Sequence, residues 1–454
     1  MWKRWKRRKV NPAAKIVLGF LLAILVGTFL LSLPIANNDG RWFPFVDSLL
    51  TATGAVCITG FSVVDIVVQF SLFGQIVLLL LVQIGGLGFI TITSLVFLLI
   101  GKKITYTERK AIQETLNQDT VQGVVKMIRN VVILVFVIEL LGFIALLPSM
   151  VNMFGWGQGI FKALFLAVSA FCNAGFDIFG TTANPGVSLS GLAQNALVLL
   201  PIMLLIIIGS TGFTILFEIG GKFKRRKMSL HAKITLTVTG ILLLVGAVTF
   251  ALLEWNNPAT LGDMSVGGKI LNACFMSVTP RTSGFFTIDY TQATPGTLAL
   301  TCIFMFIGGG SGSMAGGIKI TTLVCLLLAM LRPTRRNGDV IFAKKRISNK
   351  VIHKCMRVVG SAIMLIALAT LLICIMECNK VSLSAVLFDS IAALSTAGLS
   401  LGVVATACWG SKLVFIVLMF IGRVGAITLT VAMSSKGTDT SEEIQYPNAK
   451  IMVG

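Results

Sequence analysis

Four short turns of one kind recur along the chain at nearly constant spacing. Each turn places a small residue, a glycine and an apolar residue in succession, and the glycines lie 115, 109 and 114 residues apart. The four turns are Thr59-Gly60-Phe61, Ala174-Gly175-Phe176, Ser283-Gly284-Phe285 and Ala397-Gly398-Leu399. A second glycine signature follows each turn after 25, 34, 24 and 24 residues, starting at Gly85, Gly209, Gly308 and Gly422. One such turn alone is typical of a tight turn or of helix packing, but four at this spacing predict four tandem copies of one structural unit.

Each copy contains the same three segments around its turn. A long apolar segment comes first, a short mixed segment precedes the turn, and a second long apolar segment follows it. The first apolar segments are 16–34, 131–152, 233–253 and 358–377, and the second are 70–100, 193–219, 296–330 and 409–433. The short segments, 42–58, 158–172, 265–279 and 383–395, are too short and too polar to cross a bilayer. We expect them to be re-entrant half-helices, since irregular backbone at membrane depth is tolerated where it lines a watery cavity.

The composition also indicates a membrane protein and argues against an enzyme. Hydrophobic residues make up 55% of the chain and charged residues 12%, whereas soluble proteins carry about 25% charged residues. A water-soluble globular enzyme and a disordered chain are therefore excluded. The two histidines, His231 and His353, lie in basic, polar stretches, so a histidine metal site or a Ser/His triad inside the membrane has no histidine to use. The nine cysteines form no CxxC pair and are interpreted as small packing residues. We expect no bound cofactor.

Positive charge is sorted into a few segments. Thirty of the 38 Lys and Arg residues lie in residues 1–15, 101–130, 221–233 and 331–358 and in the tail after 433. By the positive-inside rule these segments face the cytoplasm, so both termini are expected there. The basic start followed by an apolar run resembles a signal peptide. The run from Ile16 to Pro34 is nevertheless long enough to span a membrane, and we interpret it as the first transmembrane helix.

Together these patterns predict an all-α polytopic protein of the cell membrane. Four tandem helix–pore-helix–helix repeats would give eight transmembrane helices and four re-entrant half-helices around a pseudo-four-fold pore. The expected parts are a basic N-terminus (1–15), repeat 1 (16–100), a linker with repeat 2 (101–220), repeat 3 (221–330), a linker with repeat 4 (331–433) and a cytoplasmic tail (434–454). The basic linkers are typical of orientation signals that contact anionic lipids, or they form a docking surface for a regulatory partner.

A ring of four re-entrant loops is the geometry of a cation selectivity filter. Each half-helix would point its negative C-terminal end at the axis, and the loop would turn carbonyl oxygens inward to replace a cation's hydration shell. Glycine suits such a backbone because it adopts positive φ without a steric penalty. The predicted filter residues are Cys57, Ile58, Thr59, Gly60, Cys172, Asn173, Ala174, Gly175, Arg281, Thr282, Ser283, Gly284, Ser395, Thr396, Ala397 and Gly398. Asp65, Asp177 and Asp289 follow three of the turns and would form an outer mouth.

The third repeat departs from the others by carrying six glycines in the ten residues 308–317. Each glycine inside a helix costs about 1 kcal/mol relative to alanine, so we expect an unwound intramembrane loop there. A kinked packing segment is the alternative. The loop residues singled out are Gly308, Gly309, Gly310, Ser311, Gly312, Ser313, Gly316 and Gly317.

Three charged residues inside apolar segments stand out. Arg423 directly follows Gly422, the first glycine of the second signature in the fourth repeat. An unpaired charge in the middle of a membrane span costs at least about 2.5 kcal/mol. We expect it to face the cavity below the filter and to bond carbonyls of the 308–317 loop; a snorkelling arginine near a helix end is the alternative. Lys319 is expected to reach the cytoplasmic vestibule. Glu139 is expected to pair with a neighbouring helix, with ion coupling as the alternative.

Several motifs together resemble the membrane subunit of Ktr-type potassium transporters, in the wider Ktr/Trk/HKT superfamily. They are the sequence of residues 83–89, residues 169–176, residues 278–285, Gly317-Ile318-Lys319, residues 419–423 and the tail from Tyr446 to Gly454. The resemblance implies potassium permeation through one subunit's four-fold pseudosymmetric pore, with the 308–317 loop acting as a gate beneath the filter. It also implies homodimeric membrane subunits on a cytoplasmic ring of nucleotide-binding, KtrA-like regulatory subunits.

The resemblance bears on the transported ion as well. In that family a glycine in every filter loop accompanies potassium selectivity, and a serine in the first loop accompanies sodium transport in some plant members. All four positions are glycine here, which favours potassium. A sodium-selective or sodium-coupled transporter of the same superfamily stays the nearest alternative. A carrier with inverted repeats is disfavoured because the four units run in one orientation, and a membrane enzyme is disfavoured because catalytic histidines and paired acids are missing at membrane depth.

Overall fold

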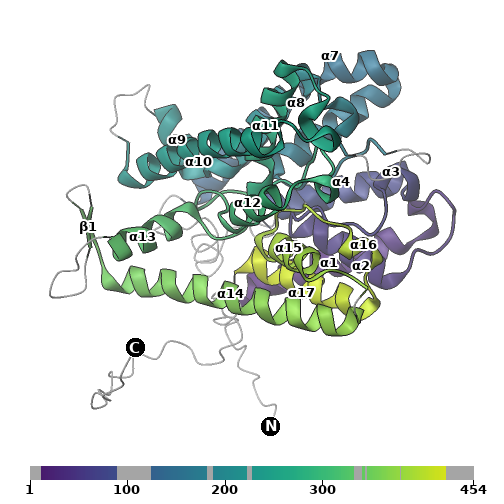
Figure 1. Ribbon diagram of the computed structural model, residues 1–454. Coiled ribbons are helices and arrows are strands. Elements are labelled where there is room, and N and C mark those ends of the chain that lie inside the picture. The colour runs from purple at the N-terminus through teal and green to yellow at the C-terminus, as the bar shows by residue number, and fades with distance from the viewer. Residues whose placement is uncertain are drawn as a thin grey trace, which may run out of the picture.

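The computed structural model describes residues 12–88, 124–180, 188–221, 228–331, 340–342, 345–378 and 380–425. These residues form a helical assembly with one small hairpin (Figure 1). The predicted N-terminal basic segment up to residue 11, the tail 434–454 and much of the basic linkers lie outside the described residues.

The first apolar segment of each repeat is a long helix. These helices are α1 (Pro12–Ser32), the first part of α7 (Val124–Cys172), α10 (Leu230–Glu254) and α14 (Asn349–Glu377). All four are long and apolar enough to cross a membrane. Large apolar side chains such as Leu22, Phe136, Leu244 and Leu371 are exposed on them, as expected of a surface that lies against lipid.

The four short segments before the turns are helices of about half that length, as predicted. They are α2 (Phe45–Val56), the part of α7 after Gly155, α11 (Val266–Val278) and α15 (Leu383–Ser395). Gly155 has a φ of 74° and separates the long and short helices within α7. α2, α11 and α15 have 12 or 13 residues and at 1.5 Å per residue reach only about 20 Å, less than the hydrocarbon thickness of about 30 Å.

The second apolar segments differ from the prediction, because their helices end or bend at the second glycine signature. α4 (Leu72–Leu87) and α17 (Trp409–Val424) each end before a glycine of positive φ, Gly88 and Gly425. α8 (Ala196–Thr211) and α9 (Phe213–Gly221) are bent by 102° at Gly212. In the third repeat α12 (Pro295–Phe306) is separated from α13 (Ile320–Leu331). The predicted total of eight spanning and four re-entrant helices stays a prediction.

Short elements connect these helices. The hairpin of β1 (Val340–Phe342) and β2 (Lys345–Ile347) is antiparallel, with Ile341 opposite Arg346, and is a departure from the all-α prediction. Val340, Ile341 and Ile347 are β-branched, which favours strand pairing. The remaining short helices are η1 (Pro34–Ala36), α3 (Ile66–Gln69), η2 (Ser190–Leu192), η4 (Pro258–Gly262), η5 (Thr279–Arg281), η6 (Tyr290–Gln292) and α16 (Val403–Thr406).

The repeats contact one another in a closed cycle. α4 packs against α7, α8 against α11, and α12 against α15. The last repeat returns to the first, since α17 packs against α2 (Figure 1). An ion pair joins these two helices, with 2.6 Å between Lys412 Nζ and Asp47 Oδ1. The chain therefore surrounds one central axis on which the four turns converge.

Candidate cation pathway

The four predicted turns meet in a ring at the centre of the cycle. Each central glycine has a φ between 73° and 85° and lies against the carbonyl oxygen of the residue before the next glycine. The pairs are Gly60 with Ala174, Gly175 with Ser283, Gly284 with Ala397, and Gly398 with Thr59. A Cβ atom on any of the four glycines would lie under 3.0 Å from that oxygen. Glycine is therefore required twice over at each position, by its φ and by the close approach.

The backbone of each turn is tied back to its own half-helix. The N–H groups of Thr59 and Ala174 donate to carbonyls five residues earlier, at 2.8 Å each, and that of Ala397 does so at 2.9 Å. Among the described residues, no hydrogen bond ends on the carbonyl oxygens of Thr59, Ala174, Ser283 or Ala397. These four oxygens, next to the ends of four helix dipoles, form a ring suited to a dehydrated cation.

The third turn has a different backbone from the other three. Ile58, Asn173 and Thr396 each adopt a positive φ two residues before their glycine, whereas Thr282 has a φ of −168°. The short helix η5 extends the third half-helix, and the Ser283 N–H donates to Thr279, four residues earlier. The departure from strict four-fold symmetry is thus local to the segment that contains Pro280.

Polar side chains of the turns are buried without a protein partner. Within the described chain, this applies to side-chain atoms of Thr59, Asn173, Thr282, Ser283 and Thr396. Buried polar atoms are almost always hydrogen-bonded to protein or water, so water or ions are expected around this ring. Arg281 is 2% exposed, with Nε and one terminal nitrogen also unpartnered among these residues. Its side chain is cationic, so any contribution to a cation site comes from its backbone.

The second glycine signatures pack directly beneath the ring. Gly85, Gly209 and Gly422 lie against the carbonyl oxygens of Val56, Phe171 and Leu394, each four residues before its ring glycine. Such contacts are typical of close helix packing by small residues. The structure shows this packing, and it shows also that the last glycine of each signature ends or bends the helix.

The 308–317 segment is unwound, as predicted. Gly310 N–H donates to Ser210 O at 2.8 Å, and Phe213 N–H donates to Gly312 O at 3.0 Å. The loop is thereby joined to the bend between α8 and α9. On its other side Gly316 lies against the side chain of Thr396 in the fourth turn. The loop therefore lies between the second repeat and the ring.

Arg423 has the contact that the sequence analysis predicted. One terminal nitrogen donates to Met314 O in the loop, and the other donates to Gly85 O, both at 2.5 Å. The second contact was not foreseen, because a backbone carbonyl freed by a helix end leaves no trace in side-chain patterns. Lys319 Nζ donates to Ala315 O and Gly316 O within the loop, and its expected reach to the cytoplasmic vestibule stays a prediction.

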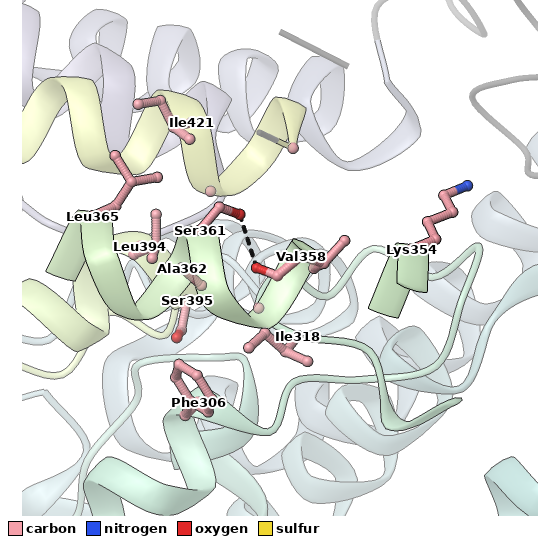
Figure 2. A pocket seen from close by; sticks show the side chains of 13 residues that line it. Phe306, Ile318, Lys354, Val358, Ser361, Ala362, Leu365, Leu394, Ser395 and Ile421 are labelled. Atoms are coloured by element: carbon pink, nitrogen blue, oxygen red, sulfur yellow. Dashed lines mark hydrogen bonds between the residues drawn. The ribbon is translucent and has the colours of Figure 1, made fainter. Parts of the chain in front are cut away.

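A mostly apolar cavity of about 270 Å³ lies beside the loop. Figure 2 shows Phe306, Ile318, Ser361 and Ile421 around it, with Lys354 at one end. Its walls come from α12, α14, α15 and α17, elements far apart in sequence, so no sequence pattern predicted it. The cavity therefore adjoins the end of the 308–317 loop at Gly317.

The predicted outer-mouth acids lie outside the ring and contact backbone groups. Asp65 caps α3 by accepting from Val67 N–H at 2.9 Å, and Asp289 accepts from Thr291 N–H at 2.9 Å. Asp177 accepts from Phe179 N–H at 3.3 Å. Each carboxylate therefore stabilises the loop that follows its turn.

Comparison with known proteins identifies the family. The TrkH family, described as cation transport proteins, matches residues 8–444. The chain belongs to this family. It is 35% identical to the Ktr system potassium uptake protein B of Bacillus subtilis, over 99% of this chain and 98% of that protein. It is 34% identical to the potassium/sodium uptake protein NtpJ of Enterococcus hirae, over 100% of this chain and 99% of that protein.

A solved structure shares the fold. The crystal structure of the potassium transporter TrkH from Vibrio parahaemolyticus matches with a TM-score of 0.72 at 17% identity, covering 96% of this chain and 87% of that one. The chain is thus a multi-pass membrane protein of a cation transporter family, which is not an enzyme family.

Proposed function

We propose that the protein takes up potassium across the cell membrane through a gated, channel-like pore. The observation that carries the proposal is the ring of carbonyl oxygens from Thr59, Ala174, Ser283 and Ala397, each against the glycine of its neighbour. Four carbonyls at the ends of four half-helices, which accept no hydrogen bond from the described part of the chain, supply the oxygen ligands that replace potassium's hydration shell. In this proposal the backbone of all sixteen predicted filter residues forms the ring carbonyls or the turns that hold them in place.

Potassium is the favoured ion because all four ring positions are glycine. A side chain at any of them would displace a carbonyl oxygen and so change the size of the site. The alternative is sodium-selective or sodium-coupled transport. It is favoured by the similarity to the Enterococcus hirae protein, whose name includes both ions.

We place the gate in the 308–317 loop with Lys319 and Arg423. The loop has no regular structure and lies next to the fourth turn. Arg423 holds it to α4 through Met314 and Gly85. A permanent positive charge below the ring also opposes cation passage in a low-dielectric environment.

Regulation is proposed to come from outside the membrane part. The similarity to a Ktr system protein supports a multi-component transporter in which a homodimer of this chain contacts a KtrA-like cytoplasmic ring. Both termini and the basic linkers would face that ring. The exposed basic residues of β2 and of the start of α14, such as Lys345, Arg346 and Lys350, offer positive charge for such a contact.

Growth of a bacterial strain that lacks potassium uptake tests this function. The strain would express the chain, and growth on low potassium and rubidium uptake would be measured with and without added sodium. We expect rescue and rubidium uptake. An absence of rescue, together with sodium uptake, would overturn the assignment of potassium as the transported ion. A dependence of rubidium uptake on sodium would instead support the sodium-coupled alternative.

A further inference from the structure

Glu139 is a buried acid that the proposed permeation pathway does not use. It lies within the long helix of α7 and is 5% exposed. Among the described residues, no basic side chain lies within ion-pair distance of it. Burial of an unpaired carboxyl group in a membrane helix is costly, so its partners indicate what it does. The structure shows that it pairs with a neighbouring helix, as expected from the sequence.

Each oxygen of Glu139 lies within reach of a donor, and the single Cys172 S–H is shared between Glu139 and Gln83. Gln83 Nε2, on α4, donates to Oε2 at 3.2 Å. The Cys172 thiol lies 3.8 Å from Oε1 and 3.7 Å from Gln83 Oε1. The three side chains thus form a closed polar cluster between the first and second repeats.

Cys172 connects this cluster to the ring. It is the last residue of α7, three positions before Gly175, and Asn173 directly after it adopts a positive φ of 58°. Its sulfur also lies against Gly86 on α4, where a Cβ atom would lie 2.6 Å from it. A shift of the Cys172 side chain would therefore move the backbone that leads to Ala174 and its ring carbonyl.

The cluster occurs at one repeat interface and not at the corresponding positions of the others. Glu139 lies 36 residues before its ring glycine, and the residues 36 before the other three are Ile24, Val248 and Ala362. Gln83 lies two residues before its second-signature glycine, where the other repeats have Ile207, Phe306 and Phe420. The contact of Glu139 with Gln83 and Cys172 therefore has no counterpart at these positions of the other three repeats.

We propose that Glu139 is a positioning residue for the second turn, acting through Cys172 and Gln83, and that it sets the preference for potassium over sodium. This inference rests on the proposed function. Selectivity depends on where the ring carbonyls lie and how far they move, so loosening one of four turns admits the smaller ion more readily. The total rate of potassium transport depends on the gate and changes less.

The primary test compares Glu139→Gln with the unchanged protein at equal amounts in the membrane. The glutamine amide presents N–H groups where Cys172 or Gln83 requires an acceptor, so one contact is lost. We expect the ratio of rubidium to sodium uptake to fall about tenfold, since a hydrogen bond to a charged group is worth about one such factor. Maximal rubidium uptake should stay within about twofold. The matched control is Glu377→Gln, because Glu377 is a buried acid at the C-terminal end of α14 that accepts from Cys408 N–H at 2.8 Å; the uptake ratio of this variant should not change.

A second pair of variants separates this role from simple loss of folding. Cys172→Ala removes the donor to Glu139 and should lower the uptake ratio as much as Glu139→Gln, whereas Cys172→Ser, which keeps a donor, should lower it less. The double variant Glu139→Gln/Cys172→Ala should show no further loss, because both changes break one connection. An unchanged ratio in both Glu139→Gln and Cys172→Ala, or losses that simply add, would overturn the inference. If the unchanged protein takes up sodium and no rubidium, the proposed function itself is wrong.

Discussion

One terminal nitrogen of Arg423 lies 2.5 Å from the carbonyl oxygen of Met314, 109 residues earlier in the chain. The other terminal nitrogen reaches Gly85 O on α4. One side chain of the fourth repeat therefore joins the 308–317 loop of the third repeat to the helix end of the first. The planar guanidinium suits two separate carbonyls, and a lysine would reach only one of them.

Replacing Arg423 by alanine should raise cation flux or loosen gating. The loop would lose its tie to α4, and the positive charge below the ring would disappear. Hydrogen bonds from a charged donor are worth about 1.5–3 kcal/mol, so the open form should gain at least about tenfold. Rubidium flux into liposomes measures this, with Arg423→Lys expected to lie between the two. Unchanged flux and unchanged regulation would contradict the role given to Arg423.

Replacing Gly60 by serine should erode the preference for potassium. The new Cβ atom would press on Ala174 O, which belongs to the ring, and displace it. Gly40→Ser is the matched control, because Gly40 also has a positive φ, of 64°, but has nothing within 4 Å of the added atom. The ratio of rubidium to sodium uptake should fall for Gly60→Ser and stay the same for Gly40→Ser. Equal ratios in the two variants would contradict the filter assignment.

Breaking the Asp47–Lys412 pair should destabilise the protein modestly. The pair joins α2 and α17 with side chains that are 13% and 19% exposed, so it is only partly screened by solvent. Asp47→Asn should lower stability by about 1 kcal/mol, seen as a lower thermal unfolding midpoint in detergent. The exchanged pair Asp47→Lys/Lys412→Asp should recover part of that loss. If Asp47→Asn unfolds at the same temperature, the closure of the cycle does not depend on this contact.

Glu254 should contribute more to stability than a surface acid does. Its carboxylate accepts from Thr294 N–H and Oγ1, both at 2.8 Å, and from Thr260 Oγ1 at 2.6 Å. It therefore fixes the end of α10 to the start of α12. Glu254→Ala leaves several buried donors unpaired and should cost about 2–3 kcal/mol, while Asp39→Asn, at an exposed site, should cost little. A thermal unfolding midpoint equal in the two variants would argue against this clamp.

The parts of the fold that could be predicted from the sequence are those that depend on local residue patterns. The ring turns, the half-helices before them and the break at 308–317 all depend on glycine placement and on the length of apolar runs. The bend at Gly212 was missed because Ile208 to Gly212 reads equally well as packing glycines within one continuous helix.

Contacts between repeats could not be predicted from the sequence patterns. The partners of Glu139 and the second partner of Arg423 depend on which repeat lies beside which, and a backbone carbonyl such as Gly85 O has no residue signature. The cyclic order follows from packing among helices up to hundreds of residues apart. The hairpin at 340–347 was missed because the basic linker was interpreted through its charge, and the run of three apolar residues from Val340 to Phe342 is too short to stand out.

The most direct test of the carbonyl ring as a potassium site is ion flux into liposomes that contain the purified protein. Rubidium uptake, as a tracer for potassium, would be compared with sodium uptake under equal gradients. We predict that rubidium enters and that sodium enters more slowly. Sodium entry without rubidium entry would contradict the account.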